Sequence, residues 1–474
     1  MVFSTLLFLF RFLPITLLIY YITPGKAKNL VLFIASLIFY SWGEVRYFPI
    51  MMALIVLNYL CGLGISHWRK YEKLKRLLLL ISIVGSLSML ICFKYSNFII
   101  ETINAMLGIS LDKIQGIEVL PLGISFYTFQ TMSYTIDVYW NKADAEHNFI
   151  DFGTYVVMFP QLIAGPIVKY RDISEKLHVY EKRVALYEIE EGITEFILGL
   201  SRKVLLADGI GKLWSDIIGT YSNGIQTSVG IGLNNATTGL AWLGVLAYSM
   251  QLYFDFSGYS LMSIGIGKML GFTFPENFNS PYMSRSITEF WRRWHITLSS
   301  WFREYVYIPL GGNRKGAVRR SFNLFVVWTL TGIWHGASWN FALWGIYYFV
   351  LLTIEKKFLL PKLEKGVFWP HVYTLFLVVV GWALFVSSEP GVGLGVLMNK
   401  LFVVQGGVSA WYFLRNYGVI LVIGMLCCSP LPMKLWRLVQ QKQWVKNSIL
   451  MGLLFLCVCY IVGASNSPFL YFNF

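Results

Sequence analysis

A histidine that could transfer protons lies inside an uncharged stretch of this sequence. Residues 321–354 contain no Asp, Glu, Lys or Arg, and His335 is their single group that titrates near neutral pH. Burying an imidazole in an apolar stretch is costly unless the protein uses it. Gly332 and Gly336 flank it and allow close approach of backbone or ligand. A histidine that only packs between helices explains the same pattern, and the residue types alone leave both explanations open.

A second histidine, His295, lies in an amphipathic segment that covers residues 284–308. At about 100° per residue, one sector of the expected helix contains aromatic side chains, one leucine and the imidazole: Trp291, Trp294, His295, Leu298, Trp301, Phe302 and Tyr305. The opposite sector is charged or polar: Arg285, Glu289, Arg292, Arg293, Ser300, Arg303 and Glu304. We expect one helix at the cytoplasmic membrane surface, with its arginines on lipid headgroups. His295 points inward, so we expect the two histidines to share a site.

The turn after this segment contains glycines and cations. Residues 309–316 read Pro-Leu-Gly-Gly-Asn-Arg-Lys-Gly, and the backbone amides of such a turn could hold a phosphate. The turn lacks the spacing and the preceding strand of a P-loop, which favours a plain cytoplasmic turn.

Two carboxylates, Asp137 and Asp255, lie within apolar runs. Buried carboxylates need partners, which favours a salt bridge to an arginine or a bond to an aromatic hydroxyl. A proton relay in a secondary transporter is the alternative. The sequence has no Gly-x-Ser-x-Gly elbow and no set of metal ligands, so we expect no metal site. General-base catalysis of direct acyl transfer therefore fits better than a covalent intermediate.

The elements that position these side chains must fold in a membrane. The chain has 474 residues, of which 56% are apolar and 14% charged, whereas a soluble domain carries about 25% charged residues. This composition excludes a soluble enzyme, a disordered chain and a disulfide scaffold. The six cysteines lie in or beside apolar runs, and we expect them to be small buried side chains.

The positive charge of the chain is local. The formal net charge is +14, and three blocks carry it: residues 66–76, 285–320 and 434–446. Short basic loops between apolar runs are cytoplasmic by the positive-inside rule, and this arrangement argues against nucleic-acid binding. We therefore expect both chain termini on the outer side of the membrane.

Thirteen apolar runs are candidate spans, since a helix needs roughly 20 residues to cross a bilayer. They are residues 3–22, 29–43, 47–65, 77–95, 119–140, 150–168, 190–207, 240–257, 259–274, 321–354, 372–388, 415–432 and 447–464, of which 321–354 is long enough for more than one pass. The first lacks a basic start and a cleavage site, so we expect a retained span and not a signal peptide. No barrel-like alternation is present.

The expected fold is an all-α polytopic membrane protein with roughly 11–13 transmembrane or re-entrant helices. We expect one integral-membrane domain over residues 1–474, with N-terminal spans in 1–118, a core with both histidines in 119–354 and C-terminal spans in 355–474. Residues 169–183 are basic and look cytoplasmic, yet three full crossings after residue 76 would place them outside. One preceding run, 119–140 or 150–168, is therefore expected not to cross.

Two long motifs give the sequence a family resemblance. One runs from Trp291-Arg-Arg-Trp-His-Ile-Thr-Leu-Ser to Arg314, and the other is Thr331-Gly-Ile-Trp-His-Gly-Ala-Ser-Trp-Asn. Together with residues 123–130, 159–166, 253–260 and 466–472, they resemble the membrane-bound O-acyltransferase (MBOAT) family. The resemblance is to the bacterial branch that includes alginate O-acetylation membrane proteins.

The resemblance implies a helical core around a tunnel, with His335 as the catalytic base and His295 as the upstream polar residue of the site. It implies no bound cofactor, acetyl-CoA as the acyl donor on the cytoplasmic side, and a bacterial inner-membrane location among membrane lipids. The acceptor would be an exported or cell-wall polysaccharide, reached directly or through an extracytoplasmic acetyltransferase partner.

Several other functions stay open at this point. Within the same chemistry, they are transfer of D-alanyl groups to teichoic acid and O-acetylation of peptidoglycan. Outside it, a secondary transporter would use Asp137 and Asp255 and tolerate loss of His335. A structural membrane scaffold would tolerate loss of both histidines.

Overall fold

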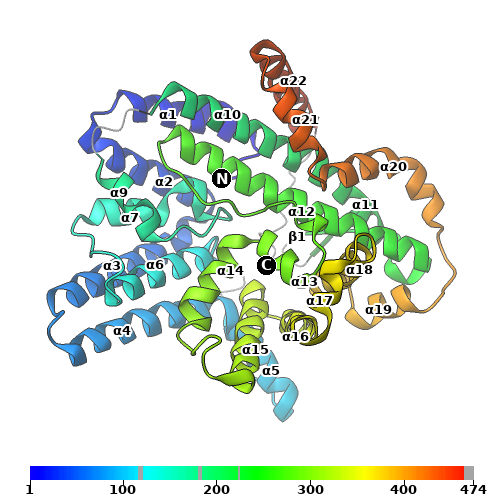
Figure 1. Cartoon of the computed structure of the whole chain (residues 1–474), viewed down its shortest axis with the longest axis horizontal. Coiled ribbons are helices and arrows are strands. Elements are labelled where there is room, and N and C mark those ends of the chain that lie inside the picture. The colour runs from blue at the N-terminus through cyan, green and yellow to red at the C-terminus, as the bar shows by residue number, and fades with distance from the viewer. Residues whose placement is uncertain (116–120, 180–183, 223–224, 464–474) are drawn as a thin grey trace. The chain divides into compact units, whose positions relative to one another are not determined.

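The protein is almost entirely helical in the residues that its computed structural model describes, which are 1–115, 121–179, 184–222 and 225–463 (Figure 1). Within them, the single sheet is a hairpin of β1 (Thr220–Ser222) and β2 (Ile225–Ser228). The prediction of an all-α fold is confirmed. The motif at 466–472 lies outside the described residues.

The first of two compact units comprises Met1–Phe196 and Tyr259–Pro275. Its helices are α1 (Leu13–Ile22), α2 (Lys28–Glu44), α3 (Phe48–His67), α4 (Glu72–Leu90), α5 (Ser96–Leu107), α6 (Ile124–Tyr139), α7 (Phe149–Val157), α8 (Phe159–Leu162), α9 (Tyr170–His178), most of α10 (Leu186–Ser201) and the last part of α12 (Thr238–Met269). This unit carries Asp137.

The second unit comprises Ile197–Gly258 and Glu276–Phe474 and carries both candidate histidines. Its further helices are α11 (Asp208–Ile218), α13 (Ile287–Arg293), α14 (Ile296–Phe302), α15 (Gly316–His335), α16 (Trp339–Ile354), α17 (Leu360–Lys365), α18 (Trp369–Val386), α19 (Leu394–Phe402), α20 (Ala410–Cys427), α21 (Leu431–Val439) and α22 (Gln443–Gly463). The first part of α12 belongs to it as well.

Five helical stretches in the described part of the chain are long and apolar enough to cross a membrane. They are Val45–His67, Glu72–Leu107, Trp369–Val386, Ala410–Cys427 and Gln443–Gly463. Apolar side chains on the last two, such as Val419 and Phe455, are exposed to a surrounding that must be lipid. This confirms a polytopic membrane protein.

The segment 149–162 is too short to cross as a helix. α7 has nine residues and α8 has four, and nine residues rise only about 14 Å. Every residue from 151 to 170 is buried, which is where irregular backbone at membrane depth is tolerated. This agrees with the prediction that a run before residue 169 does not cross.

The prediction of separate spans at 240–257 and 259–274 is wrong, because both belong to the 32-residue helix α12. Gly258 does not end the helix. A Cβ atom at Gly258 would lie 2.7 Å from the Gly199 carbonyl oxygen of α10. The glycine therefore permits close helix packing, which is a different use from a break.

The prediction of one continuous helix over 284–308 is also wrong. It forms α13, α14 and a π-helical turn, Arg303–Tyr307, with a break at His295. The break has a cause in the preceding segment: Asn279 N–H donates to the Arg293 carbonyl (2.9 Å), and Ile296 N–H donates to the Asn277 carbonyl (3.1 Å). Because these bonds engage the backbone at Arg293 and Ile296, helix α13 ends at Arg293 and helix α14 begins at Ile296.

Candidate active site

His335 ends helix α15 inside an aromatic enclosure. Its side chain is buried, and ring centroids of Trp334, Trp344 and Phe385 lie 5.1, 5.2 and 5.3 Å from the imidazole centroid. The last two rings come from α16 and α18 and meet the imidazole nearly edge-on. The run 321–354 thus makes two helices, and the histidine stands at the turn between them.

Glycines let the helices approach each other closely around His335. A Cβ atom on Gly332 would collide with the Phe341 carbonyl of α16, and one on Gly345 with the Trp328 carbonyl of α15. A Cβ atom on Gly336 would collide with the Phe341 ring. The close approach predicted beside the histidine is therefore made by protein backbone and a phenyl ring.

His295 occupies the break between α13 and α14 in a strained backbone conformation. Its φ of 44° lies in the left-handed region, which non-glycine residues seldom adopt. Such strain persists only where the surroundings over-determine it, and it clusters at functional sites. The side chain is 1% exposed, so the prediction that this imidazole faces inward is confirmed although the helix is not continuous.

A buried asparagine holds one edge of the His295 ring. Nδ1 lies 3.1 Å from Asn277 Oδ1, and the Phe256 ring meets the imidazole edge-on at 4.8 Å. Nε2 is buried and has no hydrogen-bond partner among the described residues. Burial lowers the pKa of His295 to about 3, so the ring is neutral at physiological pH.

The structure brings both imidazoles against the same indole. The Trp334 ring centroid lies 5.1 Å from that of His335 and 6.1 Å from that of His295. All three side chains belong to the second unit. The two motifs, separated by 40 positions in the sequence, thus meet at one place.

Two buried polar groups close to His335 have no hydrogen-bond partner in the described part of the chain, and no sequence pattern indicated their roles. They are the indole N–H group of Trp344 and the Tyr348 hydroxyl. Trp344 and Trp382 stack with centroids 6.1 Å apart. Native proteins leave few such groups unpaired, so each requires an explanation. One explanation is a ligand with acceptor oxygens.

The two acids within apolar runs are ion-paired. In the first unit, Asp137 Oδ1 lies 3.5 Å from an Arg171 nitrogen, the kind of partner predicted for it. In the second unit, Asp255 Oδ1 lies 2.8 Å from Lys203 Nζ, which also contacts Asp208 at 2.6 Å. The expected partner of Asp255, an arginine or aromatic hydroxyl, is a lysine instead. Both pairs give the acids structural partners, as buried carboxylates require.

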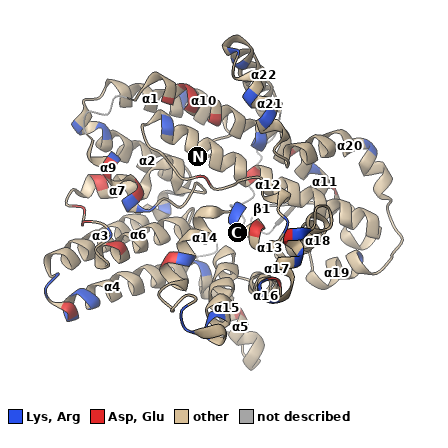
Figure 2. Cartoon of the chain, viewed as in Figure 1, with Lys and Arg blue, Asp and Glu red and all other residues tan. Residues whose placement is uncertain are grey.

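The basic face of α13 and α14 points outward, as predicted. Arg285, Arg292 and Arg303 are exposed, whereas Trp291 is buried. Figure 2 shows that many charged residues lie at helix ends and in connecting segments, and that most of the helical ribbon is uncharged. Side-chain hydrogen bonds stabilise the turn after residue 308. The Tyr307 hydroxyl bonds Asn313 Oδ1 at 2.6 Å, and the Asn323 side chain donates to the Gly312 carbonyl.

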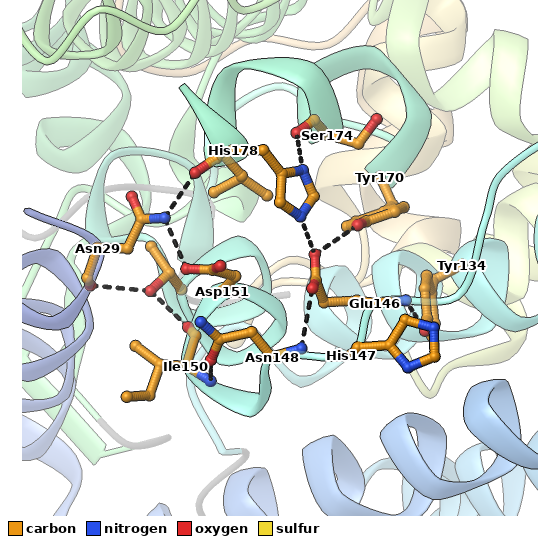
Figure 3. A network of polar contacts seen from close by, with 12 residues as sticks. Asn29, Tyr134, Glu146, His147, Asn148, Ile150, Asp151, Tyr170, Ser174 and His178 are labelled. Carbon is orange, nitrogen blue, oxygen red and sulfur yellow. Dashed lines mark hydrogen bonds and ion pairs between the residues drawn. The ribbon is translucent and has the colours of Figure 1, made fainter. Parts of the chain in front are cut away.

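A polar network in the first unit was not foreseen (Figure 3). Glu146 is buried, and its Oε2 contacts the Tyr170 hydroxyl at 2.7 Å and His178 Nε2 at 2.9 Å. His178 Nδ1 lies 2.8 Å from the Ser174 carbonyl, so both ring nitrogens face acceptors. Asp151 accepts from Asn29 at 2.6 Å.

The network has side chains of the types that bind divalent cations. One ligand atom each from Glu146, Asp151 and His178 lies within 4.8 Å of the others, and hydrogen bonds already engage all three. Glu146 and His178 lie 32 positions apart with no recognisable spacing, which is why sequence patterns could not reveal the network.

Comparison with known proteins places this geometry in context. The sequence model of the MBOAT, membrane-bound O-acyltransferase family matches residues 37–360. A probable alginate O-acetylase, AlgI, of Azotobacter vinelandii is 42% identical over 81% of this chain and 75% of its own length. A peptidoglycan O-acetyltransferase of Helicobacter pylori is 32% identical over 100% of this chain and 98% of its own. A teichoic acid D-alanyltransferase of Bacillus subtilis is 29% identical over 55% of this chain and 65% of its own.

Proposed function

The chain belongs to the membrane-bound O-acyltransferase family, and from this we propose that it moves an acetyl group from a cytoplasmic donor to a polysaccharide exported across the bacterial inner membrane. Family membership makes it a membrane O-acyltransferase. The acetyl group and the polysaccharide acceptor rest on the similarity to alginate O-acetylases. His335 in its aromatic enclosure is the observation that carries the proposal.

The reaction needs a base and donors, and the enclosure offers both kinds of group. His335 takes the proton of the acceptor hydroxyl while its oxygen attacks the acetyl carbonyl carbon. The carbonyl oxygen becomes an oxyanion, which the N–H group of Trp344 can stabilise. The carbon–sulfur bond of a thioester donor then breaks, and the proton held by the imidazole leaves with the thiol. No covalent enzyme intermediate is needed.

Acetyl-CoA is the proposed donor, as a substrate and not as a resident cofactor. The exposed arginines of α13 and of the π-helical turn, Arg292 and Arg303, support this choice, because a cationic surface attracts the phosphates of a coenzyme A thioester over long range. The acceptor is met on the outer side, either as polymer or through an extracytoplasmic acetyltransferase partner.

The test is the content of ester-linked acetate on exported polymer in cells that produce His335→Ala. We expect acetate at background level with a normal amount of protein in the membrane, because the site loses its base. His371→Ala is the matched control: His371 lies in the same unit at the start of α18, outside the enclosure. Acetate at the wild-type level in His335→Ala would contradict the proposal.

The relatives supply two alternatives with the same chemistry. One relative that the chain matches over its whole length is named for peptidoglycan O-acetylation, and another for D-alanyl transfer to teichoic acid. Mass spectrometry of the acid that alkali releases, and of the polymer that carried it, separates the three. Acetate on a soluble exported polysaccharide supports the proposal, and D-alanine or acetylated muramic acid supports an alternative.

A further inference from the structure

The side-chain oxygen of Asn277 lies within hydrogen-bond distance of two residues, His295 and Thr297. Asn277 Oδ1 lies 3.1 Å from His295 Nδ1, 2.9 Å from Thr297 Oγ1 and 3.3 Å from the Thr297 backbone nitrogen. The asparagine is 1% exposed. Its backbone carbonyl also accepts from the Ile296 N–H (3.1 Å). Asn277 therefore contacts three consecutive residues from His295 onward.

The backbone bond decides which amide atom faces the histidine. A backbone N–H can only donate, so the atom facing Thr297 N must be the oxygen of Asn277 and not its NH₂ group. The same oxygen faces His295 Nδ1 and can only accept. Nδ1 must therefore carry a hydrogen.

The groups around the ring leave this assignment undisturbed. Among the side chains that contact the imidazole are Asn277, Phe256 of α12 and Trp334 of α15, and none of these three is charged. The Trp334 ring also contacts the titratable His335. A neutral imidazole has one N–H, so the proton on Nδ1 leaves a lone pair on Nε2.

We propose that Asn277 is a positioning residue, which locks His295 in the tautomer whose Nε2 accepts a hydrogen bond from a second hydroxyl of the sugar acceptor, beside the one that reacts. The inference rests on the proposed function. Nε2 is buried and has no hydrogen-bond partner among the described residues. A buried acceptor is matched by a donor, and a sugar hydroxyl is a donor, whereas a thioester is not. His295 orients the sugar through this second hydroxyl, and His335 takes the proton of the hydroxyl that reacts.

The decisive variant is Asn277→Asp, which keeps an acceptor oxygen but adds a charge. A carboxylate beside Nδ1–H favours the imidazolium, and an opposite charge at this distance raises a pKa by roughly 1–3 units. Protonation of Nε2 removes the lone pair. Protonation of the base His335 gives the acidic limb of the wild-type rate a dependence on one proton. In Asn277→Asp a second dependence should begin roughly 1–3 units above the pKa of about 3 of His295, so that the limb becomes steeper below about pH 6. The rate of acetyl transfer is measured with labelled acetyl-CoA on inverted membrane vesicles.

Asn277→Ala tests the tautomer itself. Without the acceptor the proton can sit on either nitrogen, and we expect kcat to fall roughly ten- to a hundredfold with KM for acetyl-CoA unchanged. Thr297→Val is the matched control, because it removes the 2.9 Å bond to the same oxygen and keeps the bond to Nδ1. Its rate of acetyl transfer against pH should have the same acidic limb as that of the wild type. Thermal unfolding reports any loss of folded protein.

The outcomes separate this inference from the proposed function. If His295→Ala abolishes transfer while Asn277→Asp keeps the wild-type pH profile, the role of Asn277 is refuted and the proposed function stands. An acidic limb that becomes equally steep in Thr297→Val also refutes it. If His335→Ala transfers acetate normally, the proposed function itself fails.

Discussion

At the scale of the residue, the indole N–H group of Trp344, whose ring contacts His335, is a buried donor that the fold leaves without a partner among the described residues. Trp344 is fully buried, and its Nε1 has no hydrogen-bond partner in the described part of the chain. A buried donor left unpaired costs about 1–3 kcal/mol. An oxyanion formed during acyl transfer would accept a hydrogen bond from this N–H group. The free energy lost by burying the donor unpaired would then be regained when the oxyanion forms.

Replacing Trp344 by Phe tests this reading. An aromatic ring remains at this position, and the N–H donor is lost together with the rest of the pyrrole ring. Removing one oxyanion donor costs roughly 10²- to 10³-fold in kcat, and we expect a fall toward that range with little change in KM. Trp242→Phe is the control, because its N–H already bonds the Leu401 carbonyl at 2.8 Å. Equal activity of the two variants would remove Trp344 from the mechanism.

The sequence could identify both histidines but not their supports. His335 and His295 are titratable groups in apolar or amphipathic surroundings, and that contrast is visible without a structure. Asn277 lies in an irregular segment 18 positions before His295, and no periodicity links the two. Whether a polar residue in a loop reaches a distant ring depends on the path of the backbone, which sequence patterns do not give.

At the scale of the element, helix α13 depends on a carboxylate from far along the chain. Glu355 is fully buried, and its oxygens accept from the backbone N–H groups of Ile287 (2.6 Å) and Thr288 (2.8 Å) and from the Thr288 hydroxyl. The first N–H groups of a helix have no partner inside it, and a carboxylate also suits the positive end of the helix dipole. Glu355 thereby fixes the helix that leads to His295.

Glu355→Ala should destabilise the protein strongly. Two backbone donors and a hydroxyl would be left buried without partners, at a cost of about 3 kcal/mol or more. We expect the Tm of the detergent-solubilised protein to fall by several degrees and Glu355→Gln to fall less. Glu364→Ala, on the exposed surface of α17, should stay close to the wild type. An unchanged Tm in Glu355→Ala would show that the cap contributes nothing.

Apolar periodicity predicted helices well but helix breaks poorly. The break at His295 comes from hydrogen bonds with residues 277–279, and the unbroken course of α12 through Gly258 comes from packing on Gly199. Both depend on tertiary contacts that override local propensity. The turn at His335 was foreseen only as a second pass within a long apolar run.

At the scale of the whole molecule, composition predicted the class of protein, and the structure shows which apolar runs form long apolar helices. Thirteen apolar runs were candidates, whereas five described helical stretches are long and apolar enough to cross. Runs such as 150–168 are apolar because they are buried in protein, not because they face lipid. Hydropathy alone cannot separate the two environments.

The basic blocks predict the orientation of the C-terminal half. Residues 434–446 carry four cations and no acid, so α20 should run from the outer to the cytoplasmic side. In a cysteine-free background, Gly406→Cys should react with an impermeant maleimide on intact cells that have permeable outer layers. Gln441→Cys should react only after the inner membrane is opened. The reverse pattern would overturn the orientation and the cytoplasmic placement of the donor.

The central claim is that acetyl transfer across this membrane depends on His335. Inverted membrane vesicles from polymer-producing cells, supplied with acetyl-labelled acetyl-CoA, expose the cytoplasmic face to the donor and keep the polymer inside. The account predicts alkali-labile label on enclosed polymer with the wild type and His371→Ala, and background label with His335→Ala at equal protein. Label in His335→Ala equal to the wild type would contradict it.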